Sequence, residues 1–481
     1  MQKSVILFLL LILFATLLLA YNTLSINGLN EAQFVYRTAP DSLNAYFRDS
    51  FAFSLAYRNF NFGMKFIADL PKYSTEQAEL VDELSPNHLE LGWKELYASY
   101  SKDAFSIHAG TTEESFGNGL TFRSYKDIEF DEDHRIDGFV FKYDDAYAVK
   151  ALYGAIESPE NIGKYDLAYG ADFLSPIAYG IRLGASALTY RTLGATVYNQ
   201  RDVFASRVQV AWSNLDAYGE YANSETYKQV GLSTGFGSAI YANADYNLGK
   251  LQLGAAYKKY EDFQYRLHDL ATANYHSETL SDALATGLDE EGWQARGTLS
   301  ITSSLSLYAD YAEAWDSPKT KQMNDLYTSL DWIVDSTTMG IAYSQVEKAD
   351  DVNRYWQKES TPALSFGLPV FGKPVFVKAD FMISEKQIYA VTGKHYEPKI
   401  QSDLSIGKLA ISLGAQSNWA DFEAVIDSRY WAFMEAKYPI ASHSDLVIFG
   451  GKEAGGKVCR NGVCRYVSAF EGLKVELSTR F

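Results

Sequence analysis

The segment from Ser115 to His134 concentrates residue types that could bind or select a charged species. It reads SFGNGLTFRSYKDIEFDEDH, in which Arg123 precedes a run of acids that includes Asp127, Glu129 and Asp131. Clustered carboxylates are suitable ligands for a hard cation such as Ca²⁺. An arginine placed with acids across a narrow path would instead select solutes by size and charge. A solvated acidic loop would have the same composition, so three interpretations stay open.

The same segment carries a family resemblance. The motif FGNGLTFRSY, the acidic stretch after it and IDGFVFKY at 136–143 resemble a motif in an uncharacterised family of outer-membrane β-barrels from Bacteroidota and related bacteria. The specific part is confined to residues 115–143. The resemblance implies a barrel in the outer membrane, and it implies no substrate because the function of that family is unknown.

The two cysteines of the chain stand close together in the sequence, and in an oxidising compartment they could form a disulfide. Cys459 and Cys464 bracket the sequence Arg-Asn-Gly-Val. Asn-Gly favours a two-residue hairpin turn because both positions must adopt positive φ. The cysteines would then face each other across the hairpin, which predicts a disulfide rather than a metal site.

Catalytic and nucleic-acid-binding patterns are missing from the sequence. The seven histidines are scattered, and none is spaced with a nucleophile and an orienting carboxylate. There is no phosphate-binding loop, dinucleotide fingerprint or zinc spacing. The net charge of −17 argues against nucleic acid as a partner. We therefore predict a protein that is not an enzyme and needs no cofactor, apart from the possible Ca²⁺ site.

The elements that must carry these segments are β-strands with two different faces. The last residues, LKVELSTRF, place Leu473, Val475 and Leu477 on one face and Lys474 and Glu476 on the other. This period of two recurs along the chain and is typical of strands between lipid and a polar lumen. The terminal Phe481 resembles the C-terminal signal that the barrel-assembly machinery reads. Aromatic residues, which suit the membrane interface, make up 15% of the chain.

The alternation also predicts which charged side chains face the lumen. They carry both signs, so a hydrated lumen stiffened by ion pairs is favoured over a dedicated binding site. The main candidates are Arg182, Arg207, Arg296, Lys378, Asp380 and Glu435.

Short and long connections alternate, as expected for periplasmic turns and extracellular loops. The long ones include 112–135, 262–290, 346–358, 385–396 and 452–465. Counting gives an all-β, transmembrane, antiparallel up-and-down barrel of about 24 strands. The number would be 22 if the first hairpin, around Tyr36 to Tyr57, did not form.

The N-terminus resembles a secretory signal peptide. Lys3 precedes the apolar run from Val5 to Leu19, and Ala20 supplies a small residue for cleavage. We expect a signal peptide at 1–20 and a single barrel domain at 21–481. The mean hydropathy of −0.19 is compatible with this, because a barrel hides its apolar residues by alternation.

The predicted function is a porin-like channel in the bacterial outer membrane, which admits small hydrophilic solutes by passive diffusion. A closed sheet of this size is too wide for strand side chains alone to fill. A lumen blocked by 115–134 and 262–290 would instead favour an envelope scaffold or adhesin. A transporter of hydrophobic compounds would need an apolar pocket and an opening through the wall. Outer-face Tyr, Trp and small residues suit contacts with lipid and with other subunits alike.

Overall fold

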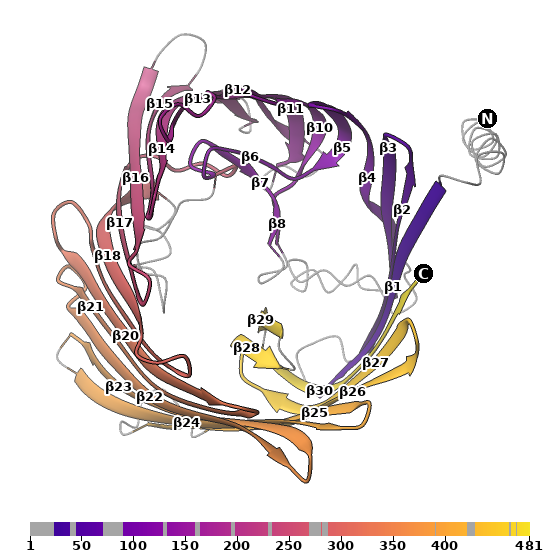
Figure 1. Cartoon of the computed structure of the whole chain (residues 1–481), viewed down its shortest axis with the longest axis vertical. Coiled ribbons are helices and arrows are strands. Elements are labelled where there is room, and N and C mark those ends of the chain that lie inside the picture. Colours follow the sequence, from indigo (N-terminus) through magenta and orange to yellow (C-terminus); the bar gives the residue numbers. More distant parts are fainter. Residues whose placement is uncertain are drawn as a thin grey trace.

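The structure is a computed structural model, which describes residues 24–38, 45–70, 90–127, 132–158, 164–193, 198–228, 233–268, 280, 287–389, 391–420, 429–460, 463–467 and 469–481. The expected signal peptide, residues 1–20, lies outside the described residues. Twenty-four antiparallel strands form one closed sheet, which confirms the predicted barrel and strand number. Figure 1 shows the ring that they make.

The barrel strands have the following bounds. They are β1 (Leu24–Arg37), β2 (Ala45–Tyr57), β3 (Phe60–Leu70), β4 (Glu90–Lys102), β5 (Phe105–Thr112), β10 (Ile136–Asp144), β11 (Ala148–Glu157), β12 (Tyr165–Leu174), β13 (Ile181–Leu193), β14 (Tyr198–Trp212), β15 (Leu215–Lys228), β16 (Ser233–Asn247), β17 (Leu251–Glu261), β18 (Asp289–Ser300), β19 (Leu305–Trp315), β20 (Lys321–Val334), β21 (Thr337–Asp350), β22 (Tyr355–Val370), β23 (Lys373–Ile388), β24 (Val391–Ile406), β25 (Leu409–Ala420), β26 (Arg429–Ala441), β27 (Ser444–Glu453) and β30 (Phe470–Arg480). Three small hairpins pair β6 (Glu114–Phe116) with β7 (Phe122–Ser124), β8 (Lys126–Asp127) with β9 (Glu132–Asp133), and β28 (Gly456–Arg460) with β29 (Val463–Val467).

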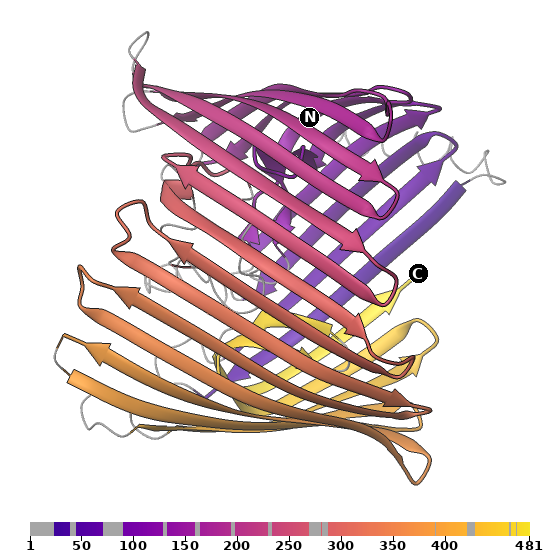
Figure 2. The ribbon, with the colours of Figure 1, turned by 60° about the vertical axis from the view of Figure 1, so that its left-hand side comes forward.

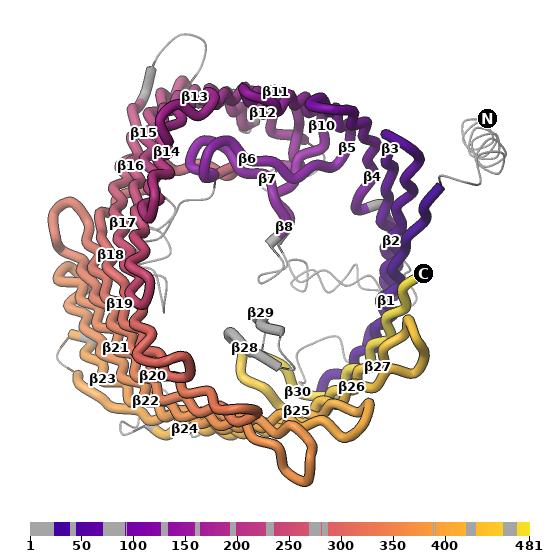
Figure 3. The backbone as a smooth tube through the Cα atoms, in the orientation of Figure 1, coloured from indigo at the N-terminus to yellow at the C-terminus, as the bar shows by residue number. Residues whose placement is uncertain are grey.

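The first and last strands close the barrel. β1 pairs with β2 on one side and with β30 on the other, where Leu29 lies opposite Arg480. The backbone N–H of Gly28 donates to the carbonyl of Phe481 over 2.8 Å, and the Phe481 ring stacks on Phe51 with centroids 5.8 Å apart. Figure 3 shows the last strand, in yellow, beside the first strand, in indigo, at this seam. The role of Phe481 as an assembly signal stays a prediction.

Alternation gives the barrel its two faces. In β17, Lys258 and Tyr260 are buried on the inner face, whereas Tyr257 and Lys259 lie on the outer face. Large apolar side chains such as Ile341, Leu364, Ile400 and Met434 are exposed on the outer face. An exposed apolar band on a closed barrel is the surface that lipid covers, so the fold is that of a bacterial outer-membrane protein. Separately, none of the helices in the described ranges is long and apolar enough to cross a membrane.

The two rims differ in their connections (Figure 2). One rim has tight turns in which Arg58, Asp103 and Ser213 adopt φ of 53°, 52° and 53°, and both ends of the barrel sequence lie at this rim. The other rim carries the longer connections. The first hairpin forms, and its strand begins at Leu24, earlier than the sequence suggested.

Two of the long loops predicted from sequence are wrong. Residues 346–358 and the described part of 385–396 are mostly strand, with only 351–354 and Tyr389 as turns. They are polar because β21–β24 continue beyond the apolar band, where outward charges pair across strands. Lys394, for example, lies 2.6 Å from Glu385 on the neighbouring strand.

Candidate functional site

The predicted charged segment folds back into the barrel as the β6–β7 hairpin. Figure 1 places this hairpin inside the ring, beside β10–β15. Its turn is Phe116-Gly117-Asn118-Gly119, in which both glycines have positive φ, 55° and 93°. A Cβ on Gly117 would lie 2.8 Å from the Glu220 carboxylate, so the glycine allows the turn to approach the wall closely.

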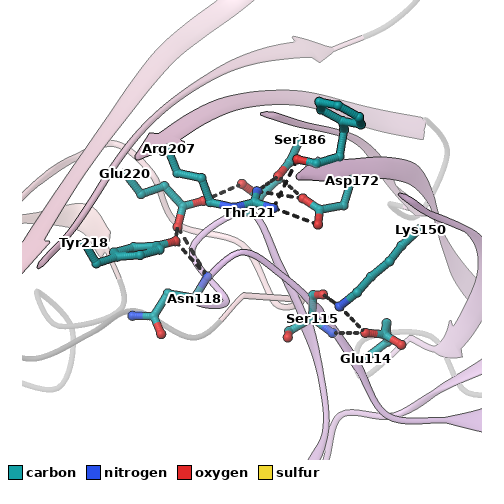
Figure 4. Close-up of polar contacts among 11 residues, drawn as sticks. Glu114, Ser115, Asn118, Thr121, Lys150, Asp172, Ser186, Arg207, Tyr218 and Glu220 are labelled. Carbon is teal, nitrogen blue, oxygen red and sulfur yellow. Dashed lines mark hydrogen bonds and ion pairs between the residues drawn. The ribbon is translucent and has the colours of Figure 1, made fainter. Parts of the chain in front are cut away.

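The tip of the hairpin binds a buried carboxylate on β15 (Figure 4). The backbone N–H of Asn118 donates to the Tyr218 hydroxyl over 3.0 Å and to Glu220 over 3.4 Å. The Thr121 hydroxyl also donates to Glu220, over 3.4 Å, and the Tyr218 hydroxyl donates to the same carboxylate. Glu220 is only 3% exposed, so the hairpin supplies hydrogen bonds that water would otherwise provide.

The base of the hairpin is held by charge. Glu114 accepts hydrogen bonds from Lys142 on β10 and from Lys150 on β11, the latter over 2.8 Å. Lys150 also donates to the Ser115 carbonyl over 2.9 Å. Burial alone would raise the pKa of Glu114, but the bonds from the two lysines outweigh it and hold the pKa below its ordinary value. The carboxylate is therefore ionised and neutralised at neutral pH.

A second buried network lies next to the tip. Arg207 donates to both oxygens of Asp172, over 2.7 and 2.9 Å, and to the Ser186 hydroxyl over 2.8 Å. The Ser186 hydroxyl donates in turn to Asp172 over 2.6 Å. Arg207 is the register partner of Glu220, so the two networks adjoin. The bidentate geometry orients these strands, and Arg207 is neutralised within the wall.

Apolar packing completes the attachment. Phe116, Leu120 and Phe122 lie on one face of the hairpin in a cluster with wall residues such as Leu152 and Leu188, all nearly inaccessible. The two phenylalanine rings have centroids 5.3 Å apart. This is core packing of the kind found in soluble domains, here between a loop and the inside of a barrel.

A second loop, the segment 262–268, contacts the β6–β7 hairpin through hydrogen bonds. The Tyr265 hydroxyl donates to the carbonyls of Thr121, over 2.5 Å, and Leu120, over 3.1 Å. The backbone N–H of Arg123 donates to the Leu267 carbonyl over 3.0 Å. Burial lowers the pKa of His268 to about 3, so its neutral ring accepts the Tyr265 N–H over 3.1 Å.

The second loop is tied to the wall at its ends. Arg201 of β14 donates to the Asp262 carbonyl over 3.0 Å, and Arg266 donates to the Glu157 carbonyl over 2.5 Å. We call β10–β17 the loop-covered wall, and we call the segments 114–124 and 262–268 that pack on it its two loop segments. The first segment is therefore a folded insert rather than a solvated loop.

The predicted constriction residues are only partly placed. Arg123 is half-buried on the hairpin face opposite Phe122, and its guanidinium lies over the Tyr125 ring at 4.5 Å. The side chain of Asp127, and all of Glu129 and Asp131, lie outside the described residues. Within the described ranges no group of three or more His, Cys, Asp or Glu could hold a metal ion, so the Ca²⁺ site stays untested.

The remaining predicted lumen residues lie on other strands. Arg296 forms an ion pair with Asp245 at 2.7 Å, Arg182 lies opposite Gln209, and Glu435 is buried opposite Ser412. Lys378 and Asp380 line a cavity of about 860 Å³ with Lys399, Gln401 and Asp403. We call its strands, β22–β25, the cavity wall. Cys459 and Cys464 are register partners in the β28–β29 hairpin, as the predicted disulfide requires.

Residues 1–285 match the model of a family described as a family of unknown function, DUF6029. The chain belongs to this family. The DUF6029 match spans both loop segments of the loop-covered wall and all of its strands, and it ends before β18. The bacterial group that the sequence resemblance implied stays a prediction.

Comparison with solved structures shows the barrel fold. A chain of the E. coli P pilus tip assembly intermediate PapC-PapD-PapK-PapG is similar with a TM-score of 0.56 at 9% identity, over 95% of this chain and 60% of that one. The siderophore receptor PirA from Pseudomonas aeruginosa is similar with a TM-score of 0.50 at 9% identity, over 95% and 80%. No curated protein matches the sequence. These identities are too low to transfer a function.

Sequence reasoning could not connect the hairpin with the residues that receive it. Glu220 and Tyr218 lie about 100 positions from Asn118 along the chain. Tyr265 and Leu267 stand in a loop whose sequence has no strand periodicity. The one available signal was the alternation of Phe116, Leu120 and Phe122 with polar residues, which is unusual for a loop that water surrounds.

Proposed function

We propose that this protein is a porin-like outer-membrane channel for the passive diffusion of small hydrophilic solutes. The observation that carries the proposal is the asymmetry of the lumen. The two described loop segments pack on the loop-covered wall, whereas the cavity wall, with charged residues such as Lys378 and Asp380, lines a space of about 860 Å³. Loops held in this way would narrow the lumen from one side and leave a wet path on the other.

The chemistry of the path would come from mixed charge. Lys378 and Asp380 face the lumen on β23, and Asp380 lies opposite Lys399 on β24. Arg123 belongs to the hairpin face turned away from the loop-covered wall. Such an arrangement would discriminate solutes by size and weakly by charge, without a dedicated binding pocket.

Single-channel conductance of the mature protein in planar bilayers tests the proposal. We expect stable open steps for the intact protein and larger steps after deletion of Ser115–His134. We also expect K378E to shift ion selectivity toward cations. K259E is the matched control, because Lys259 lies on the outer face beside Glu261 and should leave selectivity unchanged.

A plugged barrel that serves as a scaffold or adhesin is the second candidate. The interlocking of Tyr265 and Leu267 with the hairpin favours it, because two loops that bind each other can close a lumen together. Conductance that is absent from the intact protein and is present only after the deletion would replace the porin proposal with this one.

A further inference from the structure

The cavity wall has a break in its hydrogen-bond ladder between β22 and β23. The register pairs Ser360 with Ile383 and resumes only at Ala363 with Asp380. Pro362 occupies the break. Proline has no backbone N–H to donate and is normally confined to sheet edges or bulges, so the ladder loses its bonds at this residue.

A second break lies between β24 and β25. The register pairs Tyr396 with Trp419 and resumes at Lys399 with Gln416, and Pro398 occupies the gap. Between the two breaks the β23–β24 ladder is continuous, and there Phe381 pairs with Pro398. The β23–β24 hairpin is therefore loosened on both flanks at the same height.

The breaks coincide with an apolar groove on the outer face. A groove of about 850 Å³ is lined by both prolines and by apolar residues of β21–β26, among them Ile341, Leu364, Phe381 and Ile400. The small residues Ala379 of β23, Ala415 of β25 and Ala432 of β26 also line it. Toward the long-loop rim the outward pair Ile383 and Tyr396 comes next, followed by the charged pair Glu385 and Lys394, which places the groove in the outer-leaflet part of the apolar band.

On the inner face, side chains replace the missing ladder bonds. Asn418 donates to Glu397 over 2.6 Å, and Gln416 donates to the other oxygen of Glu397 over 3.4 Å. Glu397 and Asn418 are the residues that would be register partners if the ladder were continuous. An inner cavity of about 100 Å³ lies at the same place and shares Lys399, Ile400, Ala415, Gln416 and Trp431 with the outer groove. At this height only one layer of strands separates the inner cavity from the outer groove. The hydrogen bonds of Glu397 with Asn418 and Gln416 connect the strands there.

We propose that the β23–β24 hairpin is a lateral gate, through which a molecule with one long apolar chain and a polar head passes between the lumen and the outer leaflet. The apolar groove accepts the chain, while Lys399, Glu397 and Gln416 meet the polar head on the lumen side. Opening breaks the side-chain bonds of Glu397 and few main-chain bonds, because the prolines have already removed the latter. This activity is additional to the diffusion of hydrophilic solutes and does not depend on it.

Cysteine labelling from the bilayer tests the gate. In a C459S/C464S background reconstituted into vesicles, Q416C places a thiol on the lumen face of the break. S365C is the matched control, because Ser365 lies on the same face where its pairing with Lys378 is continuous. Each variant is labelled with bilayer-partitioning N-pyrenylmaleimide and, for normalisation, with a water-soluble maleimide.

We expect the normalised pyrenylmaleimide rate to be several times higher for Q416C than for S365C. Oleate, as a probe with one apolar chain, should slow the labelling of Q416C alone. Adding P362A and P398A restores two N–H donors and should bring the Q416C rate down to that of S365C. Equal normalised rates at the two positions, or a Q416C rate indifferent to both proline replacements and oleate, would overturn the gate.

Two further measurements separate the gate from folding and from the channel. Retention of the heat-modifiable band on gels shows that each variant is a folded barrel. Conductance for small ions should be the same with and without P362A/P398A, so a failure of the channel proposal and a failure of the gate give different results.

Discussion

The loop-covered wall and the cavity wall of this barrel differ in how their inner faces are packed and in how continuous their hydrogen-bond ladders are. The inner face of the loop-covered wall resembles the interior of a soluble domain, with aromatic side chains in contact and buried charges matched in pairs such as Arg207 and Asp172. The cavity wall has longer strands, an inner face whose charged residues Lys378, Asp380 and Lys399 line a cavity, and two interrupted ladders. One closed sheet thus combines a part to which inserted loops are fixed with a part whose hydrogen-bond ladders are interrupted at the apolar groove.

The buried ion pair of Lys258 and Glu290 should reveal this difference most strongly. The two charges are 2.8 Å apart, and their side chains are 1% and 0% exposed. K258A leaves a buried carboxylate without its partner, which costs about 3–5 kcal/mol. We expect a correspondingly lower urea midpoint for loss of the heat-modifiable folded band in detergent.

The neighbouring ion pair is the control for K258A. Lys259 and Glu261 are 3.0 Å apart on the outer face, and both are more than one-third exposed. An exposed pair contributes about 0–1 kcal/mol, so K259A should barely move the midpoint. Equal losses for the two variants would mean that the loop-covered wall does not behave as a core.

Removing an aromatic anchor should release the hairpin. Phe122 is fully buried between the hairpin and the wall, and a Phe→Ala change in a core costs about 3–5 kcal/mol. This free energy stabilises the attachment of the hairpin to the wall and not the hydrogen bonds between barrel strands. F122A should therefore leave the barrel folded but expose the 114–124 segment to proteolysis. F204A is the control, because Phe204 is 59% exposed on the outer face of the same wall. Equal proteolysis of F122A and the parent protein would contradict the attachment of the hairpin to the wall through Phe122.

Sequence alone predicted the architecture well because the relevant signal is local. Alternation along each strand, as in 473–481, sets both faces and the strand number. The sequence-based prediction was wrong at 346–358 and 385–396. There the strands extend past the membrane and carry outward charged residues, so their composition resembles that of loops. The attachment of the hairpin could not be predicted, since Asn118 meets Glu220 only after closure brings β15 beside it. The proposed gate could not be predicted either, because only the strand register shows that Pro362 and Pro398 line the same groove.

Acid should loosen the base of the hairpin. The pKa of Glu114 is lowered in the folded protein, so its contribution to stability is present above the ordinary Glu pKa of about 4.3. This contribution is lost as pH falls through the lower folded value. Protease resistance of segment 114–124 should therefore be constant from neutral pH down to about pH 5 and fall only in stronger acid. E114Q should weaken protection at neutral pH to about the level of the parent protein in strong acid, and should abolish that fall, because Lys142 and Lys150 then face no charge that titrates. A fall that persists unchanged in E114Q would assign the acid response to another carboxyl group.

The smallest effect on stability should come from the cavity wall. Asp380 lines the cavity opposite Lys399 and takes no part in the interlocked loops. D380N keeps the size of the side chain and removes one charge, so it should change the free energy of unfolding by no more than about 0.5 kcal/mol, as surface changes do. It should nevertheless shift the reversal potential of the open channel toward anion preference, because one lumen-facing negative charge is gone. A large loss of stability with unchanged selectivity would mean that the cavity wall is also a packed core, and the contrast between the two walls would fail.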